Sequence, residues 1–423
     1  MFGKSYVSMN FVTRTLLLSP VVFSCSMGFA SELKEETLRE AAITNGWVPT
    51  GELYINPDES LVPLGERLFD STSLSLNGSI SCKTCHQAKF GSADGIPNAA
   101  ATGHGALREE TGKDIVGPDR LLLDAKQLPR NTLPFWGRGA KGFSAFFWDG
   151  KVDASDGSII SQFGSKTPSD DAFLTAVHLP VVEIREMLDE DAFVDSLKLE
   201  SVDKSTRVYK AIADRVREKE PEVSADLAEQ LGMSVEQLTY QEYARALASF
   251  IRHEFRLKPT KFEQFMTDDA SLTVAELRGG LTFYGKGGCA TCHSGPHFSD
   301  FSFHAIALPS LGFGRNGFGV DYGRYNITFN PNDLYKFRTP PLYNVEKTAP
   351  YGHSGSIYEL DQAITAHFDP LALVDLEDMT SFERHEFFKR LATSSQSVTG
   401  RIKYLTESEV ADLTAFLKTL SFD

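Results

Sequence analysis

The sequence CKTCH at residues 82–86 and the sequence CATCH at residues 289–293 decide how this chain folds. Both follow the pattern C-x-x-C-H, which is the covalent attachment signature of c-type haem. Two thiols two residues apart lie on one turn and can each form a thioether to a porphyrin, while the adjacent imidazole binds the iron. A zinc or redox C-x-x-C site is the alternative, but two full matches in one chain favour haem.

The chain is therefore predicted to carry two c-type haems. The predicted attachment residues are Cys82, Cys85, Cys289 and Cys292, and the predicted proximal iron ligands are His86 and His293.

Helical patterns flank both motifs. Residues 64–69 predict a helix before the first motif, and Thr273 with Glu276 forms a capping box that opens the helix before the second. We expect a mainly α fold of two cytochrome c-like helical domains, each with one covalently bound haem, long loops and little β structure. The predicted division is a signal peptide at 1–30, an N-terminal haem domain at 31–245 and a C-terminal haem domain at 246–423.

Residues 1–30 are typical of a secretory signal with cleavage near Ala30, because they carry cations, no acid and an apolar stretch at 16–23. The only cysteine outside the two motifs, Cys25, lies in this segment, so we expect no disulfide in the mature chain. Lipidation of Cys25 is the alternative, although Phe23 fits a lipobox poorly. The sequence therefore predicts a periplasmic protein, since c-type haem is attached in that compartment.

The 423 residues carry a formal net charge of −15. Such a length favours two domains, and the acidic balance argues against nucleic acid or an anionic membrane as a partner. It is compatible with a basic electron donor. No stretch after the signal reaches the roughly 20 apolar residues that a membrane helix needs.

Ten short stretches, in chain order from about residue 60 to the end, resemble the bacterial di-haem cytochrome c peroxidases and their MauG-like relatives. Stretches near 105–130 and 188–240 look like insertions relative to that family. The matching stretches are 64–69, 81–86, 129–134, 148–151, 186–187, 288–293, 321–324, 337–342, 348–355 and 415–420.

The resemblance implies that the N-terminal haem is the peroxide site and that the C-terminal haem transfers electrons. Glu186 matches the family's acid/base glutamate, and an apolar surrounding would raise its pKa towards neutrality. Trp148 matches a tryptophan that lies between the haems and can relay an electron. Pro180, six residues before Glu186, matches as well.

Two further sites are implied by the resemblance. His104, between two glycines, matches a loop histidine that blocks the peroxidatic iron in many relatives; a solvent-exposed loop histidine is the alternative. Asn131 and the backbone carbonyls of Thr348 and Pro350 match an interdomain site for one calcium ion, which favours hard oxygen ligands.

The chain departs from the family at the distal ligand of the second haem. His367 lies where the peroxidases have methionine and MauG-like enzymes have tyrosine, and a second imidazole would lower the reduction potential. Met379 is the rival ligand if the alignment contains a gap. Ala176 replaces the expected active-site glutamine, for which His178 could substitute unless it is a surface residue. Tyr343 replaces a common arginine, which leaves the pairing of a haem propionate open.

Three functions are consistent with this sequence. The first is reduction of hydrogen peroxide to water, with electrons from a small cytochrome c or cupredoxin entering at the C-terminal haem. The second is MauG-like oxidation of residues on a partner protein by peroxide. The third, a di-haem electron carrier, would need neither Glu186 nor an open iron. His104 favours the first function and His367 the second. A second copy of the chain is a further candidate partner.

Overall fold

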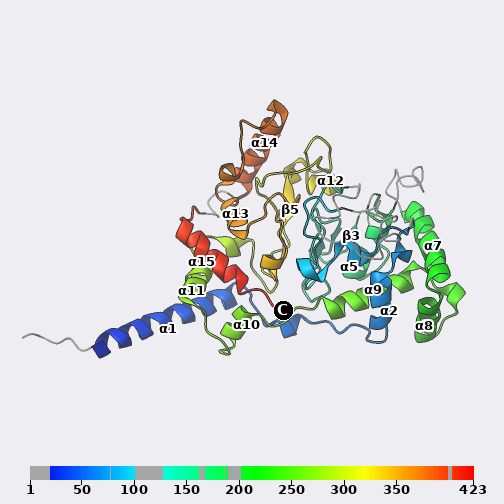
Figure 1. Ribbon diagram of the computed structural model, residues 1–423, viewed down its shortest axis with the longest axis horizontal. Helices are drawn as coiled ribbons and strands as arrows, with labels where there is room; N and C mark the ends of the chain where they lie inside the picture. Colours follow the sequence, from blue (N-terminus) through cyan, green and yellow to red (C-terminus); the bar gives the residue numbers. More distant parts are fainter. Residues whose placement is uncertain are drawn as a thin grey trace, which may run out of the picture.

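The computed structural model describes residues 20–76, 78–100, 127–161, 167–184, 186–188, 202–398 and 403–423. Helices predominate over short strands in these residues, which confirms the predicted mainly α fold class (Figure 1). The helices are α1 (Pro20–Thr44), α2 (Val62–Asp70), α3 (Cys82–Cys85), α5 (Ala172–Val177), α7 (Val202–Lys219), α8 (Pro221–Leu231), α9 (Tyr240–Glu254), α10 (Lys261–Met266), α11 (Val274–Tyr284), α12 (Tyr325–Thr328), α13 (Leu360–Thr365), α14 (Ser381–Val398) and α15 (Glu407–Lys418).

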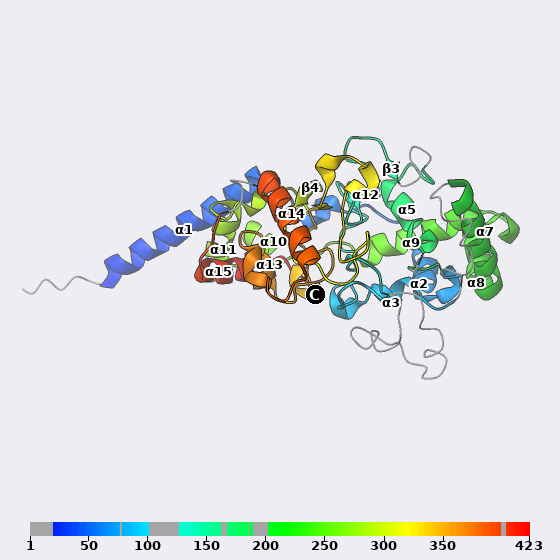
Figure 2. The same ribbon diagram turned by 90° about the horizontal axis from the view of Figure 1, so that it is seen from above.

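Two hydrophobic cores organise the chain. The first gathers apolar side chains from α2, α5, α7, α8 and α9, and the second gathers them from α1, α10, α11, α13 and α15. Figures 1 and 2 show these two groups of helices at opposite ends of the molecule. Helix α9 runs across the predicted boundary at 245 and stays in the first core as far as Phe255, so the packing favours a division between Phe255 and Phe262.

Helix α1 belongs with the C-terminal half. Its buried residues Leu38 and Ala42 join the second core, and Leu38 lies against α11 near Gly280. The helix also runs through Ala30, the predicted cleavage point. Among the described helices, none combines the length and the hydropathy that crossing a bilayer requires.

The strands are short, and the first sheet contributes Ala145, Phe146 and Val152 to the first core. An antiparallel sheet has the order β1 (Ala145–Phe146), β2 (Val152–Asp153) and β3 (Ile160–Ser161), and an antiparallel pair joins β4 (Phe303–Ala305) to β5 (Lys336–Arg338). The register pairs Phe146 with Val152 and His304 with Phe337. The two sheets meet where the Arg338 N–H donates to the carbonyl of Trp148 at 2.8 Å.

A buried ion cluster joins the two halves. Arg130 donates to both oxygens of Asp321 at 2.6 and 2.9 Å and to Asp149 at 2.6 Å, while Arg315 lies 3.2 Å from Asp149. Burial opposes ionisation of Asp149, but Arg130 and Arg315 outweigh it and lower its pKa to about 2. Loss of one member of such a buried pair typically costs about 3–5 kcal/mol. The cluster therefore fixes the two halves against each other.

Each core contains one close helix crossing. Helix α2 crosses α9 at Gly65, and α11 crosses α15 at Gly279. A Cβ at Gly65 would lie 2.0 Å from the carbonyl oxygen of Ala246, and a Cβ at Gly279 would lie 2.0 Å from that of Asp412. The predicted capping box at Thr273, which begins α11, is confirmed, and Thr406 forms the same motif at the start of α15.

Gly279→Ala is expected to destabilise the C-terminal half, because the new Cβ meets backbone that cannot move aside. Overpacking of this kind costs about 1–3 kcal/mol, although alanine is the better helix former by about 0.5–1 kcal/mol. Thermal unfolding followed by circular dichroism measures the effect. Gly51→Ala is the matched control, since a Cβ there meets nothing within 4 Å. Equal stability of Gly279→Ala and the parent would contradict the crossing.

Candidate functional site

Both motif histidines are held in the same way. The Nδ1 of His86 lies 2.9 Å from the carbonyl oxygen of Ser92, and the Nδ1 of His293 lies 2.9 Å from that of Phe298. A neutral imidazole that donates through Nδ1 carries its lone pair on Nε2. Metal-binding histidines are commonly oriented by such a second hydrogen bond. The two motifs thus present equivalent imidazoles.

The attachment thiols lie where short turns place them. Ser81 and Thr84 form a reciprocal capping box around α3, which puts Cys82 and Cys85 on a single turn against the first core. In the second motif, Gly288 has φ +67°, a left-handed conformation that favours glycine, and it leads directly into the turn that holds Cys289. None of the four motif cysteines is part of a disulfide.

A cavity of about 230 Å³ lies beside the second motif, and both halves of the chain line it. The rings of His293 and His367 face it with their centroids 6.4 Å apart. The Nδ1 of His367 lies 2.7 Å from the carbonyl oxygen of Ala363, so its Nε2 carries the lone pair as well. Met379 does not line this cavity in the part of the chain that the structure describes. The two imidazoles are spaced as two ligands of one metal ion would be, with metal–nitrogen distances near 2 Å.

Two buried arginines test whether the surroundings fit a haem. Arg338 is 2% exposed and donates only to the carbonyls of Phe147 and Thr339, while Arg138 is 8% exposed and donates to the carbonyl of Pro134. Neither forms an ion pair with any described residue, and burial lowers the pKa of each to about 9. A buried cation without a counter-ion is costly. The propionate carboxylates of two porphyrins would supply the missing anions, so these residues fit the cofactor.

Glu186 lies in a turn close to the first motif. Its N–H donates to the carbonyl of Glu183 at 3.2 Å, and its carboxylate makes no hydrogen bond or ion pair with any described residue. Burial raises the pKa of Glu186 to about 7, and the neighbouring Glu183 adds to this rise while Lys151 and Arg138 oppose it. The same carboxylate adds to the raised pKa of the Cys82 thiol, which places it beside the attachment site. These surroundings agree with the near-neutral pKa that the family resemblance implies for Glu186.

Trp148 lies at the junction of the two halves. Its indole N–H donates to the carbonyl of Asn131 at 2.9 Å, its own carbonyl accepts from Arg338, and it lines the second cavity. Pro180 begins a short 3-10 turn, Pro180–Val182, that links α5 to the segment holding Glu186. Both residues thus contribute to the framework of the predicted site.

The predicted calcium residues are only partly brought together. The Asn131 amide donates to the carbonyl of Pro350 at 2.6 Å, and its backbone N–H donates to that of His353 at 2.7 Å. The Thr348 hydroxyl donates to the carbonyl of Val345 at 3.1 Å. The two contacts of Asn131 join the halves, and the calcium site stays a prediction. His104 lies outside the described residues.

Two residues at positions where the chain departs from the family, His178 and Tyr343, are both buried. His178 is 2% exposed and packs edge-on against Tyr209 and Tyr240, so its interpretation as a surface residue is wrong. Its Nδ1 lies 2.7 Å from the carbonyl oxygen of Leu174. Tyr343 is buried in the second core, and its hydroxyl donates to the carbonyl of Pro296 at 3.2 Å.

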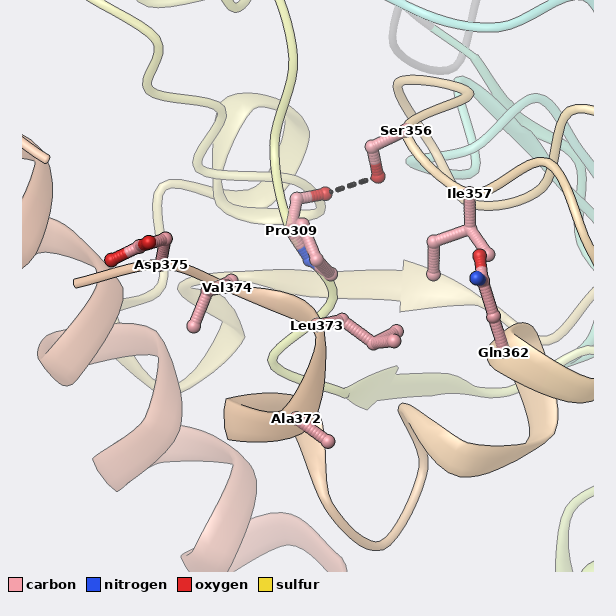
Figure 3. A pocket seen from close by; sticks show the side chains of 8 residues that line it. All are labelled: Pro309, Ser356, Ile357, Gln362, Ala372, Leu373, Val374 and Asp375. Carbon is pink, nitrogen blue, oxygen red and sulfur yellow. Dashed lines mark hydrogen bonds between the residues drawn. The ribbon is translucent and has the colours of Figure 1, made fainter. Parts of the chain in front are cut away.

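The structure shows two other candidate sites, a side-chain cluster and a separate cavity. Cys292, Asp300 and His304 have ligand atoms within 4.8 Å of one another, but Cys292 is one of the predicted attachment thiols. A separate cavity of about 480 Å³ shares the wall residue Ile357 with the second cavity (Figure 3). Its lining residues are Pro309, Ser356, Ile357, Gln362, Ala372, Leu373, Val374 and Asp375.

Sequence reasoning missed four charged residues around these sites. Arg338 and Lys151 lie inside the matched stretches, where two otherwise unexplained cations were the available signal. Arg138 and Glu183 lie outside those stretches. Their importance follows from burial, which no local pattern in the sequence shows.

A family model described as di-haem cytochrome c peroxidase matches residues 59–271, half of the chain. The chain belongs to that family. The predicted enzyme class is therefore confirmed: the protein is an oxidoreductase of the peroxide-using di-haem family, which implies two c-type haems.

Two relatives and two solved structures are similar to most of this chain. Methylamine utilization protein MauG of Methylorubrum extorquens is 27% identical over 368 residues, 85% of this chain and 77% of the relative. Cytochrome c551 peroxidase of Pseudomonas aeruginosa is 25% identical over 328 residues, 75% and 76% of the two chains. The diheme peroxidase BthA of Burkholderia thailandensis has a TM-score of 0.61 at 21% identity, with 89% of each chain covered. A MauG-like protein associated with microbial copper homeostasis has a TM-score of 0.59 at 21% identity, with 89% and 92% covered, so both structures share the fold.

Arg338→Leu is expected to lower the reduction potential of the C-terminal haem, because a nearby positive charge favours the reduced and less positive iron. It should also destabilise the holoprotein by about 3–5 kcal/mol, since a buried carboxylate is left unpaired. Spectroelectrochemical titration and thermal unfolding measure the two effects. Arg338→Lys keeps the charge and should retain most of the potential. Arg278→Leu, at a half-exposed ion pair of the same half, is the control. An unchanged potential in Arg338→Leu would remove this arginine from the haem site.

Proposed function

We propose that this protein is a periplasmic peroxidase that reduces hydrogen peroxide to water with electrons from a small donor protein, a cytochrome c or a cupredoxin, entering at the C-terminal haem. The observation that carries this proposal is the Glu186 carboxylate, which lies beside the first attachment motif with a pKa of about 7 and has no hydrogen-bonding partner among the described residues. An electron carrier needs no such group. A general acid/base works best when its pKa lies close to the working pH.

In the N-terminal site, Glu186 is the residue that we propose moves the proton. When bound, the N-terminal haem supplies an iron with an open position for peroxide. Glu186 would take a proton from one oxygen of the peroxide and deliver it to the other, which leaves as water. Two electrons and two further protons complete the reduction of one peroxide to two waters. Leu179 and Met187 are buried in the same core, so the partly buried carboxylate has apolar residues near it.

Trp148 is the proposed relay between the two sites. Its backbone and side chain are both hydrogen-bonded across the junction of the halves, to Arg338 and to Asn131. This anchoring holds the indole at the wall of the second cavity. An electron that enters at the second site can therefore pass through an aromatic ring held in one orientation.

His367 is the proposed distal ligand of the C-terminal haem, opposite His293. The 6.4 Å separation of the rings and the matching Nδ1 hydrogen bonds support this pairing over Met379. An imidazole in place of a thioether favours ferric iron and lowers the potential. The donor would then need a low potential of its own.

The second candidate function is MauG-like oxidation of residues on a partner protein by peroxide. Low potential at the second site, from His367, would make that site a poor acceptor from ordinary high-potential cytochromes. The apolar surroundings of Tyr343, where relatives commonly have arginine, are a further departure from the peroxidases. These two residues favour this alternative.

Three remaining assignments belong to the proposal. His104 would block the peroxidatic iron until the second site is reduced, and the insertion after it makes that loop unlike the family's. Asn131, Thr348 and Pro350 would hold one calcium ion between the halves. Residues 1–30 would direct secretion, and the two halves would act as separate haem domains.

Turnover separates the two functions. The reduced holoprotein is mixed with hydrogen peroxide and a reduced small cytochrome, and oxidation of the cytochrome is followed by its absorbance. Oxidation at many turnovers per second is expected for the peroxidase. Little turnover together with a stable near-infrared band would support the MauG-like alternative and contradict the peroxidase.

Glu186→Gln is expected to leave both haems attached and to slow peroxide reduction by about 10²–10⁴-fold, the range for loss of a general acid/base. In the parent, the rate should rise with pH through about 7, because only the ionised carboxylate can accept the proton. Stopped-flow mixing with peroxide measures the rate. Glu254→Gln, on the exposed end of α9, is the matched control. An unchanged rate in Glu186→Gln would exclude Glu186 from the reaction.

His367→Ala is expected to abolish the low-spin bis-imidazole electron paramagnetic resonance signal of the oxidised protein. The reason is that one of the two axial nitrogens is removed. Met379→Ala should leave the signal intact. Persistence of the signal in His367→Ala, or its loss in Met379→Ala, would assign the ligand elsewhere.

A further inference from the structure

Lys151 and Glu183 form an ion pair that lies between the junction of the halves and the turn holding Glu186. The Lys151 Nζ lies 2.6 Å from a carboxylate oxygen of Glu183, and the lysine side chain is 8% exposed. The backbone N–H of Lys151 donates to Asp149, which is wholly buried in the ion cluster of the junction. The position of the lysine is therefore fixed by the fold.

Glu183 and Glu186 share a single turn but have different surroundings. The Glu183 carbonyl accepts the N–H groups of Glu186, Met187 and Leu188, which closes the turn on itself. One carboxylate has a lysine as its partner, whereas the other has no hydrogen-bonding partner among the described residues. Two neighbouring carboxylates whose surroundings differ in this way divide between an ionised and a protonated role.

We propose that Glu183, ion-paired to Lys151 and one turn from Glu186, is a positioning residue that controls when the Glu186 carboxyl gives up its proton. This inference rests on the proposed function of Glu186 and identifies what controls it. No bond to substrate is assigned to Glu183 or Lys151. Their effect is electrostatic and acts across one turn.

The charges facing these groups come from several elements. Glu183, Lys151 and Arg138 face Glu186, together with the Cys82 sulfur, which carries no charge once it is a thioether. Lys151, Arg315 and Asp149 face Glu183, and their net effect is a lowered pKa for Glu183 in spite of its burial.

Arg315 adds a link to the C-terminal half. It lies between Gly314 and Asn316 in a glycine-rich segment and pairs with Asp149 at 3.2 Å. Since Arg315 also contributes to the field at Glu183, a cation from the electron-transfer half helps to set the protonation of the peroxide site. The control of Glu186 therefore depends on how the halves are docked.

The test is an infrared titration of the oxidised holoprotein, with the C=O stretch of a protonated carboxylic acid as the readout. Glu186→Gln identifies the band of Glu186. Glu183→Gln removes a negative charge and should move the titration of that band about one pH unit lower. Lys151→Met removes a positive charge and should move it about one pH unit higher. The pH profile of the peroxide rate should move in the same two directions.

Control variants distinguish this electrostatic effect on Glu186 from a general loss of structure. Lys210→Met and Asp214→Asn make the same charge changes at an exposed pair on α7 and should leave the band where it is. Lys151→Arg keeps the cation and should restore the parental titration. Shifts of equal sign in Glu183→Gln and Lys151→Met, or no shift in either, would overturn the inference while the role of Glu186 stands. A titrating band that persists in Glu186→Gln would instead overturn both.

Discussion

Covalent attachment of a porphyrin to one turn of the chain is the constraint on which the rest of this structure depends. In each half, a short turn presents two thiols and an imidazole, and a backbone carbonyl orients that imidazole. The core of each half contains a helix crossing so close that only glycine fits. A rigid cofactor needs such a rigid frame, since small shifts of the frame would move the ligand off the iron.

The two sites differ in the residue that accompanies the motif histidine. The second cavity has His367 opposite the motif histidine, a closed arrangement suited to electron transfer. The first has a carboxylate poised near neutrality. The buried cluster of Arg130, Asp149 and Asp321 fixes one site against the other, and Trp148 is anchored at that same junction. Communication between the sites is thus a property of the docked halves.

Much of this arrangement could be predicted from the sequence because the relevant signals are local. The spacing of C-x-x-C-H, the capping boxes and the short matched stretches each depend on residues a few positions apart. Glu186, Trp148 and His367 could be proposed as site residues for that reason. The rest depends on contacts across the chain. Arg338 and Arg138 became significant only when burial showed them without counter-ions, and His178 proved to be buried against two tyrosines. Helix α9 continues through the predicted boundary because its apolar face matches α2, which is about 180 positions earlier in the chain.

The haem content of the purified, secreted protein tests the central claim most directly. Intact-mass spectrometry together with a pyridine haemochrome assay should give two covalently bound haems per polypeptide. Each should be lost separately when the cysteines of one motif are replaced. A single haem per chain, or a protein without a Soret band, would contradict the account.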